Sequence, residues 1–547
     1  MYRSGIRYVY KVPLVFARTR YSFFRGMSTQ PHVGVVGAGL SGLRCADILA
    51  RNGSRVTILE ARGRIGGRVH QQEVSGHLVD LGPNWIHGSG ENPIVAIAEA
   101  TGTIAQDPEG ENIVISPHGH LIRASMTEKV ADFVWMTIAE AFEFSNRHGS
   151  SIPPERSLFD FFREKVQQTQ FSDAEKELCL GACKMWGAYV GDPIDRQSLK
   201  FFYLEECIDG SMISSFRLTV VMTDMDLDNY FVASTYHRIL EYIGKAAQTN
   251  VDIHFHQPVV SIDAPIRDSD NPQKTHQVTI RTATGAKYNF DEVVVTCPLG
   301  WLKRNTTAFH PPLPPRLLEA ITNMSYGRLE KVYIRFPRAF WHTPSTECEE
   351  NTRGPVFAQF LEPSYTTHPD DIEWNQECFS LACLPAPHTQ PALLFYTYGP
   401  CATHIVTAIS SLVPGSPAYK ETLLNIFQPF YSRLPGYNSS SVDCHPSDIL
   451  ATAWQADEYA GNGSYCNFQV GSTHANRDIE TLRSGAGIGS ERGLWFAGEH
   501  TAPFVALGTT TGAYWSGERA AGAVCERLGL GRDGIGSERD DSLPSAK

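Results

Sequence analysis

Several features that would assign this chain to other protein classes are missing from its 547 residues. The twelve cysteines form no C-x-x-C pair, and the closest spacings lack the companions that a zinc site needs. Cys401 and His404 form one C-x-x-H motif, but the sequence has no second pair of ligands to complete a metal site with it. No apolar run approaches the roughly 20 residues that cross a bilayer. We therefore expect neither a metal site nor membrane insertion, and the scattered cysteines favour a reduced intracellular protein.

Positive charge is in deficit over the whole chain. Lys and Arg number 47 against 59 Asp and Glu, which gives a net charge of −12. This balance argues against a general nucleic-acid binder, and it would help to attract cationic substrates if it were focused in a cleft. Apolar residues make up 42% of the chain and charged residues 19%, which excludes wholesale disorder. A chain of this length should form at least two domains with room to bury a cofactor.

Acidic residues are absent from the N-terminal segment, where the first one is Asp47. The basic residues there are Arg3, Arg7, Lys11, Arg18, Arg20 and Arg25. A basic segment free of acidic residues is typical of a mitochondrial transit peptide, and the charges interrupt the apolar stretch that a secretory signal needs. The alternative is that Met27 is the true start and that residues 1–26 are an extension absent from the mature protein. We expect a cytoplasmic or mitochondrial location.

A glycine turn lies between a short apolar strand at His32–Val36 and a helix that should run through residues 43–49 and end at Gly53. A second strand follows at Arg55–Glu60, so the segment predicts a βαβ unit with a parallel sheet. The turn has the form G-x-G-x-x-G, with glycines at 37, 39 and 42. These glycines allow a tight turn, close approach of backbone to a pyrophosphate and close helix packing. Glu60 is placed to accept hydrogen bonds from ribose hydroxyls.

The block that follows, Arg62-Gly-Arg-Ile-Gly-Gly-Arg68, adds glycines and guanidinium groups beyond the ribose acid. It resembles the G-G-R fingerprint of the flavin-containing amine oxidase superfamily. The resemblance continues at 80–88, 327–336, 493–501 and 508–518, and it is closest to polyamine and spermine oxidases. It implies FAD as the cofactor. The cofactor-binding residues that we expect are Gly37, Gly39, Leu40, Ser41, Gly42, Glu60, Ala61, Arg62, Arg68, Gly82, Pro83, Asn84, Trp85, Val259, Trp454, Gly498, Glu499, Thr509 and Thr510.

The resemblance also implies two catalytic residues. Lys331 matches the family lysine that holds a water near flavin N5, and His87 matches a residue that lines the substrate cavity. From the residues alone, Lys331 could instead be a strand residue that faces water while Val332 and Ile334 face the core. His87, beside Trp85, could be a packed and hydrogen-bonded histidine.

The substrate walls are implied by the segment from Ala453 to Tyr465, which resembles the family segment that supplies one aromatic ring over the flavin. Tyr465 is then one wall, with Trp454 in support. Thr509 stands where some members place the second aromatic residue, and this departure argues against a cage of the monoamine oxidase type. His87, Tyr465 and Thr509 are the substrate-contacting residues that we expect. Gly498 and Gly508 suit backbone pressed against a ligand before a helix that opens near Thr510.

We expect an α/β fold in which a Rossmann-like FAD-binding domain is interleaved with an α+β substrate-binding domain. Helical spacing dominates residues 124–250, and strand patterns return after Val251. The expected division is a leader at 1–30, a discontinuous FAD-binding domain at 31–90, 235–315 and 450–530, a substrate-binding domain at 91–234 and 316–449, and a disordered tail at 531–547.

The expected reaction is oxidation of a C–N bond in a polyamine or another amine. A hydride passes to flavin N5, dioxygen is the acceptor and becomes hydrogen peroxide, and the imine product hydrolyses. One alternative is an L-amino acid oxidase or a tailoring amine oxidase on the same fold; the other is a non-catalytic flavoprotein that binds a ligand. A histone demethylase is disfavoured because no long heptad insertion is present. The oligomeric state and the mode of flavin attachment stay open.

Overall fold

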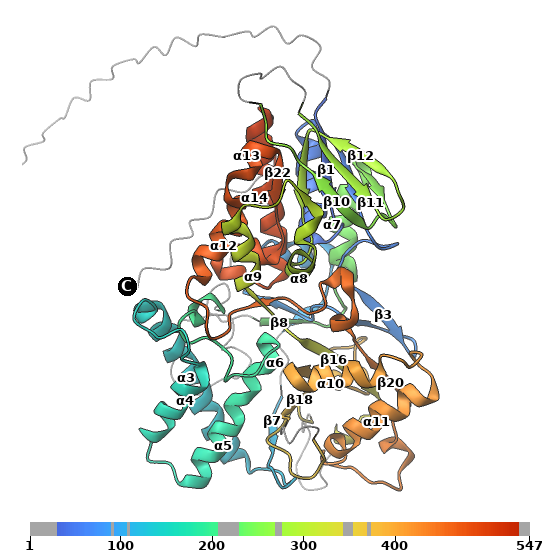
Figure 1. The fold of residues 1–547 in the computed structure, drawn as a ribbon. Coiled ribbons are helices and arrows are strands. Elements are labelled where there is room, and N and C mark those ends of the chain that lie inside the picture. Colours follow the sequence, from blue (N-terminus) through green and yellow to red (C-terminus); the bar gives the residue numbers. More distant parts are fainter. Residues whose placement is uncertain are drawn as a thin grey trace, which may run out of the picture.

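The computed structural model describes residues 30–88, 92–106, 110–205, 229–268, 276–342, 354–368 and 374–534. The expected leader, apart from residue 30, and the expected tail from 535 onward lie outside these residues. Figure 1 shows two lobes, one around β1 and α14 and the other around β16 and α3. Among the described helices, none is long and apolar enough to cross a membrane.

A five-stranded parallel sheet forms the core of the first lobe. Its order is β22 (Leu494–Phe496), β13 (Glu292–Val295), β1 (His32–Val36), β2 (Arg55–Leu59) and β9 (Asp252–His254). The strands are rich in valine because both faces are buried. Val33 and Val35 pack with the helices on one face, whereas Val36 packs with a second sheet on the other. The predicted α/β fold with a parallel sheet is confirmed.

The helices on this sheet are α1 (Leu40–Arg51), α7 (His237–Asn250) and α14 (Thr510–Leu528). α1 ends as predicted, with Gly53 just beyond its C-terminus at φ +91°. α1 and α14 approach closely: the Oγ atoms of Ser41 and Ser516 lie 3.0 Å apart. A Cβ on Gly517 would lie 2.3 Å from the carbonyl oxygen of Ser41. Glycine is therefore required at this crossing.

The other face of the parallel sheet is covered by a smaller sheet of β12 (Lys287–Phe290), β11 (Val278–Thr282), β10 (Val259–Asp263) and β14 (Phe309–His310). The strand patterns expected after Val251 are confirmed in these strands and in β13. Shorter elements complete this lobe and its junction: β3 (Gln71–Val74), β4 (His77–Asp80), α2 (Pro93–Thr101), α8 (Leu299–Arg304), α9 (Pro315–Asn323), β15 (Ser325–Tyr326), β21 (Cys466–Asn467), α12 (Ala475–Ser484) and α13 (Ile488–Arg492).

A six-stranded, mainly antiparallel sheet organises the second lobe. Its order is β20 (Asp448–Ala451), β16 (Leu329–Arg335), β19 (Ala392–Tyr398), β18 (Gln376–Ser380), β17 (Phe357–Phe360) and β7 (Asn112–Ile115). One face packs on α3 (Ala124–His148), α4 (Leu158–Gln167) and α5 (Asp173–Cys183). The other face packs on α10 (Gly399–Ile409) and α11 (Pro417–Tyr431). Because the sheet lies between two helical layers, both faces of β16 are buried.

The helices of the substrate side begin at strong local signals. Ser157 and Asp160 form a reciprocal capping box at the start of α4, and Ser172 and Glu175 form another at the start of α5. Each box satisfies two amide groups that the first helical turn leaves unpaired. The helical spacing expected at 124–250 is confirmed in α3 and α7. Between the lobes lies a small sheet of β5 (Trp85–His87), β8 (Asn229–Val232) and β6 (Ala105–Gln106).

Candidate active site

A cavity of about 290 Å³ lies where the first lobe meets the second. Segments distant in the chain converge on it: the glycine turn, the loop before β5, strand β16 and the start of α14. The predicted site residues that line it are Gly39, Leu40, Ser41, Arg68, Gly82, Pro83, Asn84, Trp85, His87, Lys331, Trp454, Tyr465, Gly498, Glu499, Thr509 and Thr510. Gly37, Gly42, Glu60, Ala61, Arg62 and Val259 lie outside its wall.

The glycine turn presents the start of α1 to the cavity. Gly37 has φ +105°, a conformation that favours glycine, and its amide donates to the carbonyl of Leu59. A Cβ on Gly39 would meet nothing within 4 Å, whereas a Cβ on Gly42 would lie 2.0 Å from the carbonyl oxygen of Gly37. Gly42 therefore serves the packing of the turn, and Gly39 leaves backbone open to the cavity. The first amides of α1 have no intrahelical acceptor and suit a phosphate.

Glu60 and the Arg62–Arg68 block lie directly beside the turn. The Glu60 carboxylate accepts the amides of Ala38 and Arg62, both at 2.8 Å. The amide of Gly66 donates to the carbonyl of Ala38 at 2.8 Å. These contacts hold the acid and the second glycine loop against the dinucleotide turn, although Arg62 itself pairs with Asp457 at 2.5 Å.

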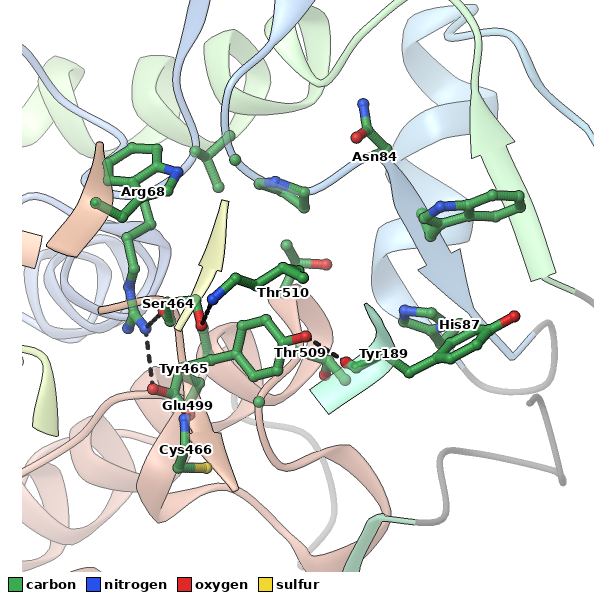
Figure 2. A pocket seen from close by; sticks show the side chains of 18 of the residues that line it. Arg68, Asn84, His87, Tyr189, Ser464, Tyr465, Cys466, Glu499, Thr509 and Thr510 are labelled. Atoms are coloured by element: carbon green, nitrogen blue, oxygen red, sulfur yellow. Dashed lines mark hydrogen bonds and ion pairs between the residues drawn. The ribbon is translucent and has the colours of Figure 1, made fainter. Parts of the chain in front are cut away.

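Arg68 connects this turn to the C-terminal block. Its guanidinium donates to Glu499 at 3.0 Å and to the carbonyl of Ser464 at 2.5 Å, as Figure 2 shows. Burial opposes ionisation of Glu499, but Arg68 and His500 more than offset this and lower its pKa. The pair is thus a charged structural connection at the cavity wall.

The start of α14 forms another wall of the cavity. Thr509 is the N-cap: its side chain accepts the amide of Gly512 at 2.9 Å. The amides of Thr510 and Thr511 have no acceptor within the helix, so the positive end of the helix dipole faces the cavity. The helix opening expected near Thr510 is where the structure places it.

Lys331 lies on β16 with only 5% of its surface exposed. Its Nζ donates to the carbonyl of Gly82 and to Oδ1 of Asn84, and it lies 3.4 Å from the carbonyl of Asp80. Burial lowers the pKa of Lys331, although the Asp80 carboxylate opposes the shift. The interpretation of Lys331 as a strand residue facing water is wrong, because the segment from Asp80 to Asn84 covers its side chain.

His87 ends β5 at the cavity. Its Nδ1 lies 2.8 Å from Oδ1 of Asn229 on the neighbouring strand. Since that oxygen only accepts, Nδ1 carries the proton and Nε2 is the acceptor. Burial lowers the pKa of His87, which favours the neutral ring. His87 is therefore packed and hydrogen-bonded, as expected for a structural histidine, and it is also part of the cavity wall.

The aromatic wall includes a residue that the sequence did not single out. The Tyr465 phenol donates to the backbone carbonyl of Tyr189, and both side chains line the cavity (Figure 2). The indole of Trp454 donates to the carbonyl of Leu81 at 3.1 Å, which fixes its ring at the wall. Tyr189 precedes Val190 at the end of the short helix α6 (Gly187–Val190), where no local pattern signals a ligand.

Other lining residues were also missed. Tyr396 and Glu377 come from β19 and β18, and Glu205 ends the 3-10 helix Phe202–Glu205. The Tyr396 hydroxyl donates to Oδ1 of Asn84 at 3.2 Å and accepts the indole N–H of Trp85 at 3.1 Å. The signal that could have found them is strand pairing, of Tyr396 with Lys331 and of Glu377 with Tyr396, which a single sequence does not reveal.

The cavity fits a flavin dinucleotide. Two helix starts aim unpaired amides at it, the backbone at Gly39 is open, and Glu60 follows β2 at the position of a ribose acid. The apolar and aromatic remainder of the wall suits a flat ring system and a small substrate. The fold and the cavity thus define a dinucleotide-binding protein with an enclosed pocket beside the cofactor.

Comparison with known proteins names the class. The model for flavin containing amine oxidoreductases matches residues 40–525, and the chain belongs to this family. Its cofactor is FAD, it is an oxidoreductase that acts on amines, and the predicted resemblance to polyamine oxidases is confirmed.

Two curated relatives and one solved structure illustrate the similarity. The peroxisomal N(1)-acetyl-spermine/spermidine oxidase of Bos taurus is 26% identical over 90% of this chain and 94% of its own. Probable polyamine oxidase 4 of Arabidopsis thaliana is 27% identical, but the match spans only 57% of this chain and 60% of that protein. A putrescine oxidase double mutant with redesigned cofactor binding has a TM-score of 0.63 at 18% identity, covering 91% of this chain and 99% of its own; it shows the fold alone.

Proposed function

We propose that the protein oxidises a C–N bond of a polyamine or a related amine, with dioxygen as the final electron acceptor and hydrogen peroxide as a product. Bound FAD supplies the acceptor of the hydride through N5. The observation that carries the proposal is the buried amine of Lys331, held at the cavity by Gly82 and Asn84 beside an aromatic wall. The two curated relatives named above, both oxidases of polyamines by name, support the choice of substrate class.

The residues of this chain then have defined tasks. The buried apolar wall disfavours a charged substrate nitrogen, so it lowers the pKa of the bound amine and favours the neutral, reactive form. Tyr465 and Tyr189 orient the carbon chain, and His87 offers Nε2 as an acceptor for a substrate N–H. Lys331 positions water for hydrolysis of the imine product, with Asn84 holding its ammonium in place. The division into a discontinuous FAD-binding domain and a substrate-binding domain, with the bounds given in the sequence analysis, is also a proposal.

The competing function is oxidation of an amino acid, which needs an arginine to bind the carboxylate. Among the described residues that line the cavity, the arginine is Arg68, and its guanidinium already contacts Glu499. The described part of the wall therefore favours an amine without a carboxylate.

The experiment is a substrate panel with the purified yellow protein. Spermine, N-acetylspermine, simple monoamines and amino acids are incubated with the enzyme in air while peroxide is measured. Polyamines should give the highest kcat/KM. Peroxide from amino acids alone would establish the amino acid oxidase instead. A flavin that no amine bleaches without oxygen would identify a ligand-binding flavoprotein.

A further inference from the structure

A fully buried acid stands next to Lys331 on β16. Glu330 has 0% of its surface exposed. Because neighbouring residues of a strand point to opposite faces, its side chain lies on the face of the sheet away from the cavity. Val332 of the same strand packs on that face with the helices α10 and α11. Glu330 does not line the cavity, so any effect that it has on a ligand must pass through other residues.

The Glu330 carboxylate binds the segment that follows β20. One oxygen accepts the hydroxyl of Thr452 at 2.5 Å and the amide of Trp454 at 3.0 Å. The other oxygen accepts the amide of Gln455 at 2.9 Å. The two amides begin the 3-10 helix Trp454–Ala456, and amides at a helix start have no acceptor within the helix. The carboxylate therefore fixes the start of this helix and with it Trp454, which lines the cavity.

Thr452 connects the same carboxylate to the backbone of Lys331. The Lys331 amide donates to Oγ1 of Thr452 at 2.8 Å, and the Thr452 amide donates to the carbonyl of Lys331 at 2.9 Å. Because Oγ1 accepts the Lys331 amide and a carboxylate only accepts, the hydroxyl proton of Thr452 points to Glu330. The backbone of Lys331 is therefore held by a hydroxyl whose own orientation is set by Glu330.

A second set of contacts leads from Trp454 to the Lys331 ammonium. The indole of Trp454 donates to the carbonyl of Leu81 at 3.1 Å. The carbonyl of the next residue, Gly82, accepts a hydrogen bond from Nζ of Lys331. The contacts thus close into a ring, in which Glu330 holds Trp454, the indole holds the loop at Leu81, and the loop holds the lysine ammonium.

We infer that Glu330 is a positioning residue for the proposed amine oxidation. It sets the place of the Lys331 ammonium at the cavity through Thr452 and Trp454, and it touches neither substrate nor cofactor. This inference rests on the proposed function, in which Lys331 positions water. A misplacement of roughly 1 Å in such a group costs up to about 100-fold in rate, so turnover should fall while the ligands remain bound.

The test is a double-mutant cycle in the holoenzyme. Glu330→Gln replaces one acceptor oxygen by an NH2 group, so at least one of the hydrogen bonds is lost. We expect kcat to fall by roughly 10- to 100-fold with FAD still bound and with KM changed by less than about 3-fold. In the Lys331→Met background the same substitution should change kcat by less than about 2-fold, because the group that Glu330 positions is already absent. A residue that only stabilises the fold would lower kcat by the same factor in both backgrounds.

A milder pair of variants keeps the inference open to test if Glu330→Gln does not fold. Thr452→Val removes the hydroxyl at nearly constant volume and should lower kcat, whereas Thr452→Ser keeps the hydroxyl and should retain the native kcat. The matched control is Glu292→Gln. Glu292 is 1% exposed and accepts the indole of Trp495 at 2.9 Å. It begins β13, at the opposite end of that strand from Thr296, which lines the cavity, so its loss should cost stability without a change in kcat.

The outcomes separate the inference from the function on which it rests. Equal losses of kcat from Glu330→Gln in the two backgrounds overturn the inference, as does a native kcat in Glu330→Gln or in Thr452→Val. If no amine reduces the flavin of the native protein, the proposed function fails, and the contacts are then judged by hydrogen exchange. Faster exchange of the amides of Lys331 and Trp454 in Glu330→Gln than in the native protein supports the positioning contacts; unchanged exchange overturns them.

Discussion

The two ends of the cavity offer different kinds of groups to a ligand. At the dinucleotide end these groups are mainly backbone amides, at the start of α1, at the start of α14 and in the glycine loops at 37–42 and 62–68. At the substrate end, they come from side chains on neighbouring strands, chiefly Lys331, Tyr396 and Glu377. Backbone amides bind the constant part of a cofactor, whereas side chains can vary with the substrate. Substitutions at the two ends should therefore fail in different ways.

The largest expected effect is at the backbone end. In Gly42→Ala the new Cβ would lie 2.0 Å from the carbonyl oxygen of Gly37, so the turn and α1 must move apart. We expect a loss of stability of roughly 3 kcal/mol and a colourless protein. The matched variant is Gly39→Ala, whose Cβ meets no protein atom within 4 Å. It should fold normally but bind FAD more weakly. Equal melting temperatures for the two apoproteins would contradict this division.

The next effect is at the side-chain end. Lys331→Met removes the buried amine but keeps the length of an apolar chain, so FAD should remain bound and the protein yellow. Turnover of amines should fall by roughly 100-fold or more, the range typical of a lost group that acts on proton transfer or water. Lys287→Met, on the exposed face of β12, serves as the control. Stopped-flow reduction and steady-state peroxide release measure the loss, and an unchanged kcat would remove Lys331 from the proposed mechanism.

These variants also show what the sequence could and could not predict. The dinucleotide turn was predictable because its strand, its glycines, its helix and Glu60 lie close together in the chain. The start of α14 was predicted from the resemblance and also from the glycines that precede Thr510. Tyr396 and Glu377 were missed because their position depends on the register of β16, β19 and β18. The burial of Lys331 depends on the distant segment from Asp80 to Asn84, which alternation along one strand does not reveal.

A pH-dependent stability effect should come from Glu377. Burial raises the pKa of this carboxyl to about 7, although the hydrogen bond from Gln359 opposes the shift. Between the unfolded and folded pKa values the native state holds more protons than the unfolded state, so stability falls as pH rises through this window. At pH 8 the free energy of unfolding of Glu377→Gln should therefore exceed that of the native protein by about 1–3 kcal/mol, and the variant should unfold at a higher temperature. The difference should shrink toward pH 5.

The difference between the two proteins is the quantity to measure, because burial also raises the pKa of Glu205 to about 7 and raises the pKa of Asp80. Those groups titrate in both proteins and cancel in the comparison. A variant that is less stable than the native protein at pH 8 would mean that the carboxylate has a protein partner.

The smallest effect should follow from Thr509→Ala, which removes the N-cap of α14. The loss should be about 1 kcal/mol, and Thr509→Ser should restore it. Ser416→Ala removes a comparable cap from α11, where the Ser416 side chain accepts a hydrogen bond from the amide of Tyr419. Both substitutions should lower the melting temperature of the apoprotein to a similar extent, since each leaves one amide without its acceptor. Only Thr509→Ala should also weaken FAD binding, by a few-fold, because α14 begins at the cavity and α11 does not. Equal FAD affinity in the two variants would show that the start of α14 does not hold the cofactor.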